Sequence, residues 1–160
     1  MTKEKRPVHL GFLIHDVSRL RRTVVDKALR PLGVTRSQWW VLSSLSRYRG
    51  TGMVQTELSK VLEVGKVTIG GLIDRLEARG YVKRRPSPGD RRAKRVLMTG
   101  KGTKLLAQIQ KVAKVVNAEI MTGISAGDIT RVETVLHKMK HQLIAMDAVP
   151  GSSGSDMDKD

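Results

Sequence analysis

The sequence predicts a mainly helical protein with one small β-ribbon, and three observations support this fold class. Apolar residues recur at spacings of three and four along most of the chain. A single stretch, 81–99, instead predicts two short extended segments joined by a loop rich in proline and glycine. Only 3% of the 160 residues are aromatic, so the core has to consist mainly of Leu, Val, Ile and Met.

The N-terminal part predicts two helices after a charged start, 1–7, that we expect to be disordered. The first helix spans 8–29 and ends at Pro31 and Gly33. Its apolar positions follow helical spacing: Leu10, Leu13, Val17, Leu20, Val24 and Ala28. Thr35 is a good N-cap for the second helix. The second helix carries Trp39, Trp40, Val41, Leu42 and Leu45.

The next segment predicts a short helix, a tight turn and a longer helix. The short helix begins at Gln55 or Thr56, and Gly65 closes the turn. The longer helix ends at Arg79–Gly80, a cationic last turn followed by a glycine C-cap. We expect its buried face to hold Val67, Leu72, Ile73 and Leu76. This order is the helix-turn-helix pattern, in which the second helix enters the major groove of DNA.

A basic ribbon follows the longer helix. Tyr81 and Val82 begin one strand, 83–95 form a loop, and 96–98 return as a second strand. The loop holds seven Lys or Arg residues against one acid, Asp90. A ribbon with a cationic tip can reach a phosphate or the minor groove beside the groove that a helix occupies. A solvated basic loop remains the alternative for any single Lys or Arg.

Two further helices complete the chain. Thr99 is the expected N-cap of a helix over 100–121, Gly123 ends it, and Ser125 caps the last helix. The apolar positions of the last helix approach heptad spacing: Ile129, Val132, Leu136, Met139, Leu143 and Met146. Such a stripe usually meets a partner helix, so we expect a homodimer, with an intramolecular bundle as the alternative.

Charge and cysteine content narrow the class of partner. The formal net charge of +15 and a pI near 10.7 predict a polyanionic partner, most commonly nucleic acid. The chain has no cysteine, which excludes disulfides and thiolate metal sites. No apolar run approaches the roughly 18–20 residues of a membrane span, and the start lacks the apolar core of a signal peptide. We therefore expect a cytoplasmic protein without a membrane partner.

Neither a metal nor a cofactor is expected. His137 and His141 lie four residues apart, which is a chelating spacing, but four histidines without cysteine make a complete site hard to assemble. No nucleophile–histidine–acid order, phosphate-binding glycine loop or pair of carboxylates stands out. We expect no enzymatic activity.

Several short motifs resemble the winged-helix signature of the MarR family of bacterial transcriptional regulators. The matching residues are Leu72, Leu76–Glu77, Gly80–Val82, Arg84–Arg85, Asp90–Arg92 and Leu97–Thr99. Met98 is an insertion relative to the family pattern. The resemblance implies a winged helix-turn-helix with dimerisation helices at both ends of the chain. The implied division is 1–33 for the N-terminal dimerisation helix, 34–99 for the DNA-binding domain, 100–147 for the C-terminal dimerisation helices and 148–160 for a disordered tail.

The residues expected to meet double-stranded DNA come from the helix-turn-helix and the ribbon. Thr68 can reach a base edge and Ile69 a thymine methyl group. The resemblance places Arg92 in the minor groove and makes Asp90 the acid that orients it. The full predicted set is Gln55, Thr56, Lys66, Thr68, Ile69, Arg75, Arg84, Arg85, Asp90, Arg91, Arg92 and Lys94.

Two glycines on the same helix, Gly70 and Gly71, leave two interpretations open. Each costs up to about 1 kcal/mol relative to alanine in a helix. They either reduce direct base readout, or they let the backbone approach DNA or a neighbouring helix closely.

The resemblance also implies an effector pocket between the dimerisation helices and the winged helix. Two tryptophans beside Arg36 can receive an aromatic group with an anionic end, such as a phenolic acid or its CoA thioester. A role for the tryptophans in the core alone is the alternative. The candidate effector residues are Phe12, His15, Arg19, Arg36, Trp39 and Trp40.

The leading functional hypothesis is a dimeric repressor that binds a pseudo-palindromic operator and is released by such an effector. The alternative is an architectural DNA-binding protein without a ligand. RNA binding is weaker than either, because the exposed stacking aromatics of single-strand readers are missing.

Overall fold

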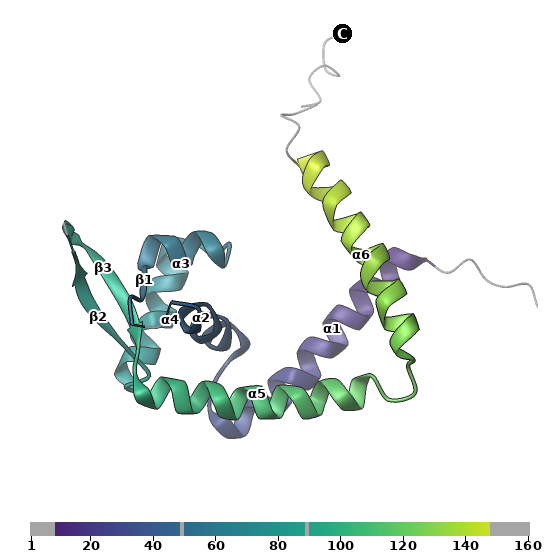
Figure 1. Cartoon of the computed structure of the whole chain (residues 1–160), viewed down its shortest axis with the longest axis horizontal. Helices are drawn as coiled ribbons and strands as arrows, with labels where there is room; N and C mark the ends of the chain where they lie inside the picture. The colour runs from purple at the N-terminus through teal and green to yellow at the C-terminus, as the bar shows by residue number, and fades with distance from the viewer. Residues whose placement is uncertain (1–8, 49, 89, 148–160) are drawn as a thin grey trace, which may run out of the picture. The chain divides into compact units, whose positions relative to one another are not determined.

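The computed structural model describes residues 9–48, 50–88 and 90–147, with backbone alone for 90–92. The predicted disordered start (1–7) and the predicted disordered tail (148–160) lie outside these residues. The chain divides into two compact units, Met1–Ile120 and Met121–Asp160. The helices of the first unit are α1 (Leu10–Leu29), the 3₁₀ turn η1 (Arg30–Leu32), α2 (Arg36–Ser46), α3 (Gln55–Val61), α4 (Lys66–Ala78) and α5 (Gly100–Ile120) (Figure 1). The second unit holds α6 (Ala126–Asp147).

The mainly helical fold with a small β-wing is confirmed, but the sheet has three strands. They are β1 (Met53–Val54), β2 (Val82–Ser87) and β3 (Asp90–Met98), in the antiparallel order β1-β3-β2. Met53 pairs with Val96, so the residues before α3 join the wing to the helix-turn-helix. The sequence did not predict this third strand.

The predicted loop over 83–95 is wrong, because most of it belongs to the β2–β3 ladder. Arg85 pairs with Arg95, and Pro86 pairs with Lys94. Pro86 is tolerated because β2 is an edge strand, where a missing N–H donor leaves no central ladder bond unmade. The wing is therefore a rigid two-stranded arm along most of its length.

The predicted helix ends are confirmed by their hydrogen bonds. Gln38 N donates to Thr35 Oγ1 at 3.3 Å, and Thr35 N donates to Gln38 Oε1 at 3.0 Å, which is a complete capping box. Gly102 N donates to Thr99 Oγ1 at 3.1 Å, and Asp128 N donates to Ser125 Oγ at 3.1 Å. These caps satisfy orphan N–H groups of α2, α5 and α6.

The core of the first unit is aliphatic, as predicted, and draws on α1, α2, α4, β3 and α5. Its fully buried members include Leu29, Leu42, Ile73, Val96 and Ile109. Only the end of α1 reaches this core. The rest of the predicted apolar stripe of α1 stays between 45% and 53% exposed: Leu10, Leu13, Val17, Leu20 and Val24.

The described part of the second unit, residues 121–147, contains no buried residue. Helix α6 is described along its whole length, and none of its residues is buried. Apolar side chains therefore remain exposed along α6, among them Val132, Leu136 and Leu143.

A close contact holds the start of α5 against the base of the wing. A Cβ at Gly102 would lie 2.1 Å from the Tyr81 carbonyl oxygen, closer than any side chain allows. Thr99 completes the junction, since its Oγ1 donates to the Gly80 carbonyl at 2.7 Å. The position of the wing is thus tied to the helix that follows it.

Candidate nucleic-acid interface

The buried face of α4 differs from the predicted one at two positions, 67 and 69. Ile69 is 0% exposed and packs with Leu72, Ile73 and Leu76, whereas Val67 is 91% exposed. At 100° per residue, Ile69 lies three, four and seven residues before these core positions, which is the spacing of one helix face. The predicted contact of Ile69 with a thymine methyl group is therefore wrong, and so is the predicted burial of Val67.

The exposed face of α4 is bordered by hydrogen-bonding and cationic side chains. Lys66, Thr68 and Arg75 are all exposed, as predicted. Gly70 and Gly71 lie between them, and a Cβ at Gly71 would meet no atom within 4 Å. The helix therefore offers a low surface with few projecting groups.

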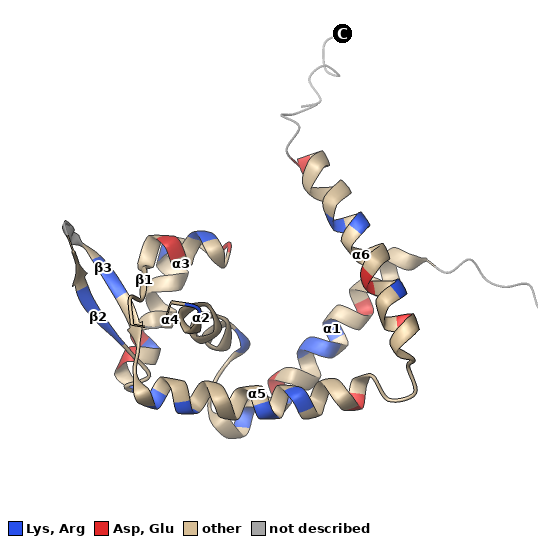
Figure 2. Ribbon diagram, in the orientation of Figure 1, with Lys and Arg blue, Asp and Glu red and all other residues tan. Residues whose placement is uncertain are grey.

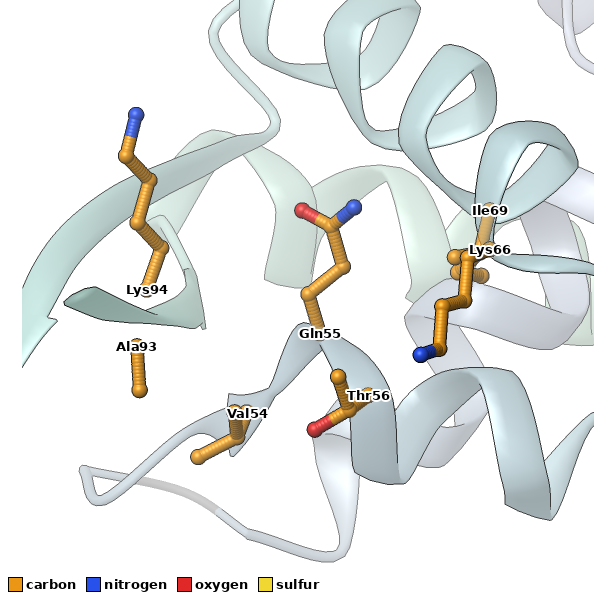
Figure 3. Close-up of a pocket in the computed structure, with 7 residues that line it drawn as sticks. All are labelled: Val54, Gln55, Thr56, Lys66, Ile69, Ala93 and Lys94. Carbon is orange, nitrogen blue, oxygen red and sulfur yellow. The ribbon is translucent and has the colours of Figure 1, made fainter.

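A groove of about 450 Å³ lies between the starts of α3 and α4 and strand β3. Its lining includes five of the residues predicted to meet DNA, which are Gln55, Thr56, Lys66, Ile69 and Lys94 (Figure 3). They come from three different elements, so folding brings them together from distant positions in the sequence. Two lysine side chains border this groove, which makes it suitable for a phosphate backbone.

Arg84 is a structural residue rather than the predicted phosphate contact. Its Nη1 lies 2.5 Å from Glu77 Oε2, its Nη2 lies 2.6 Å from Asp74 Oδ1, and its backbone N–H donates to Glu77 Oε1 at 2.8 Å. Its side chain is only 18% exposed. Burial would lower the pKa of Arg84, but the hydrogen bonds and charges of Asp74 and Glu77 outweigh burial and raise it. The contacts fasten β2 to α4.

Two other wing residues keep their cationic groups exposed. Arg85 and Lys94 are exposed on β2 and β3, and Figure 2 shows basic residues along both strands. Asp90, Arg91 and Arg92 begin β3, and the described part of the structure includes only their backbone. Their contacts with DNA stay predictions.

One ion-paired cluster was not predicted from the sequence. Asp74 and Glu77 on α4 lie ten and seven residues before Arg84, and no local spacing rule links a helix to the following strand in this way. The exposure of Val67 could have been predicted from the sequence. Leu72, Ile73 and Leu76 define the buried face, and helical spacing places Val67 on the opposite side.

The predicted effector residues fall into two groups. Arg36, Trp39 and Trp40 follow the spacing i, i+3, i+4 and so share one face of α2. Trp39 packs against the core, Trp40 is 50% exposed, and Arg36 Nε lies 2.6 Å from Asp26 Oδ1.

Of the other predicted effector residues, Phe12 and His15 lie near the start of α1 and Arg19 lies at its middle. Phe12 is 73% exposed, and Arg19 pairs with Asp16 at 3.3 Å. Phe12 and His15 line an open hollow that is separate from the hollow lined by Arg36. Since Phe12 precedes Asp26 by 14 residues of α1, about 20 Å of helix separates Phe12 from the Asp26–Arg36 pair. One chain does not bring the six residues into a single pocket.

The described residues offer neither a metal-binding cluster nor a membrane-spanning helix. No group of three or more His, Cys, Asp or Glu side chains there could hold a metal ion. No helix in the same part of the chain is both long and apolar enough to cross a membrane.

Comparison with known proteins identifies the family. A sequence profile of the MarR family matches residues 32–93. The apo form of MarR from E. coli is 29% identical, with a TM-score of 0.73 over 84% of this chain and 98% of that chain. A mutant E. coli MarR complexed with operator DNA is 29% identical, with a TM-score of 0.74 over 82% and 94%. The transcriptional regulator PA3341 is 33% identical, with a TM-score of 0.72 over 86% and 99%. With this fold, this helix-turn-helix and this wing, the chain belongs to the MarR family of transcriptional regulators.

Proposed function

We propose that the protein is a homodimeric repressor that binds a pseudo-palindromic operator and is released by a small aromatic acid or its CoA thioester. The observation that carries the proposal is the joint geometry of α4 and the wing. The uncovered face of α4 is bordered by cationic side chains, and Arg84 fastens the basic wing to that helix. One rigid body can then place a helix in the major groove and an arm beside it.

The contacts with DNA divide into positioning and reading. Lys66, Arg85 and Lys94 would bind phosphates and set the register, and Thr68 would reach a base edge. The family resemblance places Arg92 in the minor groove. The E. coli MarR mutant that shares this fold was solved with operator DNA, which supports the same use of the fold here.

The exposed apolar stripes of α1 and α6 support the homodimer. Each stripe leaves large aliphatic side chains uncovered within one chain, and heptad spacing on α6 favours a helix partner. A two-fold dimer would present two copies of α4, with half-site centres about 10–11 bp apart. The operator would then be pseudo-palindromic.

The shared face of Arg36, Trp39 and Trp40 is the proposed part of the effector site within one subunit. An aromatic ring can stack on exposed Trp40, while a carboxylate competes with Asp26 for the Arg36 guanidinium. Phe12 and His15 can join this site only if a second subunit supplies them, whereas Arg19 lies two turns before Asp26 on the same helix. A ligand that prefers the subunit arrangement unable to bind DNA would release the operator, with a coupling of about 1–3 kcal/mol.

The test is fluorescence-anisotropy titration of DNA from immediately upstream of the gene, repeated with aromatic acids and their CoA thioesters. We expect at least one compound to weaken operator binding and to quench tryptophan fluorescence. Arg36→Gln should abolish both effects and leave DNA binding in the absence of ligand intact, whereas Arg22→Gln, a substitution of another exposed arginine, should change neither. Operator binding that no compound affects would contradict the effector part of the proposal.

A ligand-independent architectural DNA-binding protein is the second candidate. It is favoured by the absence of side chains at Gly70 and Gly71, which leaves two positions of α4 without a group to read base edges, and by the net charge of +15. It predicts a steep dependence of affinity on salt with little preference among sequences, whereas the repressor predicts a specificity ratio of about a thousandfold or more.

A further inference from the structure

Val67 is the most exposed of the large apolar side chains that the structure describes, at 91%. It is the second residue of α4, between exposed Lys66 and Thr68. The core of the first unit does not need it, because Ile69, Leu72, Ile73 and Leu76 already supply the buried face of this helix. Its exposure therefore needs a reason outside the fold of one chain.

The neighbours of Val67 on the helix surface have no side chains. Residues three and four positions onward share its face, and these are Gly70 and Gly71. A Cβ at Gly70 would meet only the Gln55 side chain, at 3.4 Å, and one at Gly71 would meet nothing within 4 Å. Val67 thus projects from a stretch of the face that is otherwise low. The next side chain on this face is Asp74, two turns farther on, whose carboxylate is paired with Arg84. Because valine is β-branched, its two methyl groups are held in one preferred rotamer.

The charges around Val67 indicate what covers it. Lys66 precedes it and borders the groove that Lys94 also lines, and exposed Arg75 lies farther along the helix. Cations around one isolated apolar side chain suit a polyanion better than a protein surface or a lipid tail. In the major groove of DNA the apolar group on a base edge is the C5-methyl group of thymine.

We propose that Val67 packs against a thymine methyl group and specifies thymine at one position of each operator half-site, with Gly70 and Gly71 allowing α4 to approach the bases closely. This rests on the proposed function, since it requires α4 to lie in a major groove. It assigns to Val67 the contact that the sequence predicted for Ile69, which the fold buries.

The experiment removes one methyl group from DNA at a time. The full-length chain first selects duplexes from a random-sequence pool, and the tightest duplex is then remade with deoxyuridine in place of each thymidine in turn. Deoxyuridine keeps the pairing edge and lacks only the C5-methyl group. Binding is measured by anisotropy for the wild type, for Val67→Ala and for Val115→Ala, which shortens an exposed valine on α5.

We expect one thymine in each half-site whose replacement weakens wild-type binding about fourfold per half-site, the effect of one buried methyl group. Val67→Ala should bind the unmodified duplex more weakly and lose nothing further at that thymine. Val115→Ala should keep the wild-type response to deoxyuridine. The folded state of each variant is checked by its thermal unfolding.

Two results would overturn the inference while leaving the proposed function in place. In one, the wild type binds every deoxyuridine duplex as tightly as the original. In the other, Val67→Ala retains the full loss at the same thymine. Failure to select any preferred duplex would instead contradict the proposed function, and the inference with it.

Discussion

Arg84 on β2 lies 2.6 Å from Asp74 on α4, and its other guanidinium nitrogen lies 2.5 Å from Glu77 one turn later. One side chain therefore spans two positions of α4, the helix that we propose to face DNA, and fixes the direction of the wing relative to it. The neighbouring Arg85 is exposed and makes no ion pair within the described residues. Two adjacent arginines of the wing thus have separable roles.

Arg84→Ala should lower both stability and DNA affinity. Its loss leaves two carboxylates near each other without their cation, and we expect the free energy of unfolding to fall by about 1–3 kcal/mol. Arg85→Ala is the matched control: it should weaken DNA binding and leave the urea midpoint almost unchanged. Equal loss of stability in the two variants would contradict the assigned roles.

The stabilisation from Arg84 should not depend on pH over the physiological range. Despite the opposing effect of burial, Asp74 and Glu77 raise the pKa of Arg84 above its ordinary value. A cation with a raised folded-state pKa contributes stability that is fully present below the unfolded pKa and is lost only as pH rises through the folded pKa. The difference in unfolding free energy between wild type and Arg84→Gln should therefore be constant between about pH 6 and 10. A difference that disappears near pH 8 would contradict this assignment.

Gly71→Ala should raise stability and lower DNA affinity. The added Cβ meets nothing within 4 Å, so the variant should gain up to about 1 kcal/mol in unfolding free energy from helix propensity. Close approach of DNA to the same face should make the methyl group cost affinity. Gly11→Ala adds a methyl group to open space on α1 and is the control. We expect Gly11→Ala to leave operator binding unchanged. If Gly71→Ala also left operator binding unchanged, DNA would not approach α4 closely at this position.

Gly102→Ala should destabilise the junction between the wing and α5. Its Cβ would lie 2.1 Å from the Tyr81 carbonyl oxygen, whereas one at Gly100, two residues earlier, would meet nothing within 4 Å. Overpacking of this kind costs about 1–3 kcal/mol, and we expect the upper end because the obstacle is backbone. Thermal unfolding of Gly102→Ala and Gly100→Ala compares the two positions directly. Similar melting temperatures would show that the junction can yield.

Leu136→Glu should dissociate the proposed dimer. Leu136 is 42% exposed on α6 within the predicted heptad stripe, and a carboxylate there would be buried against a partner helix. Lys138→Glu, at an exposed position of the same helix, is the control for added negative charge. Sedimentation should give a monomer for the first variant and a dimer for the second. A Leu136→Glu variant that remains dimeric would place the dimer contact on another surface.

The sequence predicted what local physics determines and missed what distant contacts determine. Thr35 and Gln38 are three residues apart, so the capping box was readable from Thr35 onward. The strands of the wing could not be predicted in the same way. Pro86 and the basic residues around it have the composition of a loop, and only pairing with β3 makes them a strand. The role of Arg84 depends on Asp74 and Glu77 across a turn, which no periodicity encodes. The prediction buried Val67 and exposed Ile69, whereas the structure does the reverse. Helical spacing from Leu72 and Ile73 distinguishes the two positions, so this error was avoidable.

The predicted domain boundaries followed expected function and not packing. They separated the helices expected to serve dimerisation from the DNA-binding domain. In the structure, Val25 and Leu29 of α1 and Ile109 of α5 belong to the same core as the winged helix. Helices α1 and α5 therefore belong to the same compact unit as the winged helix. Their role in dimerisation stays a proposal.

Sequence-specific regulation is tested most directly by binding of the protein to the DNA immediately upstream of its gene, against a scrambled duplex of equal length, at about 150 mM salt. A repressor whose α4 side chains read base edges should prefer the upstream DNA by about a thousandfold or more. Equal affinity for the two duplexes, with both falling together as salt rises, would contradict sequence-specific regulation and leave charge alone as the basis of binding.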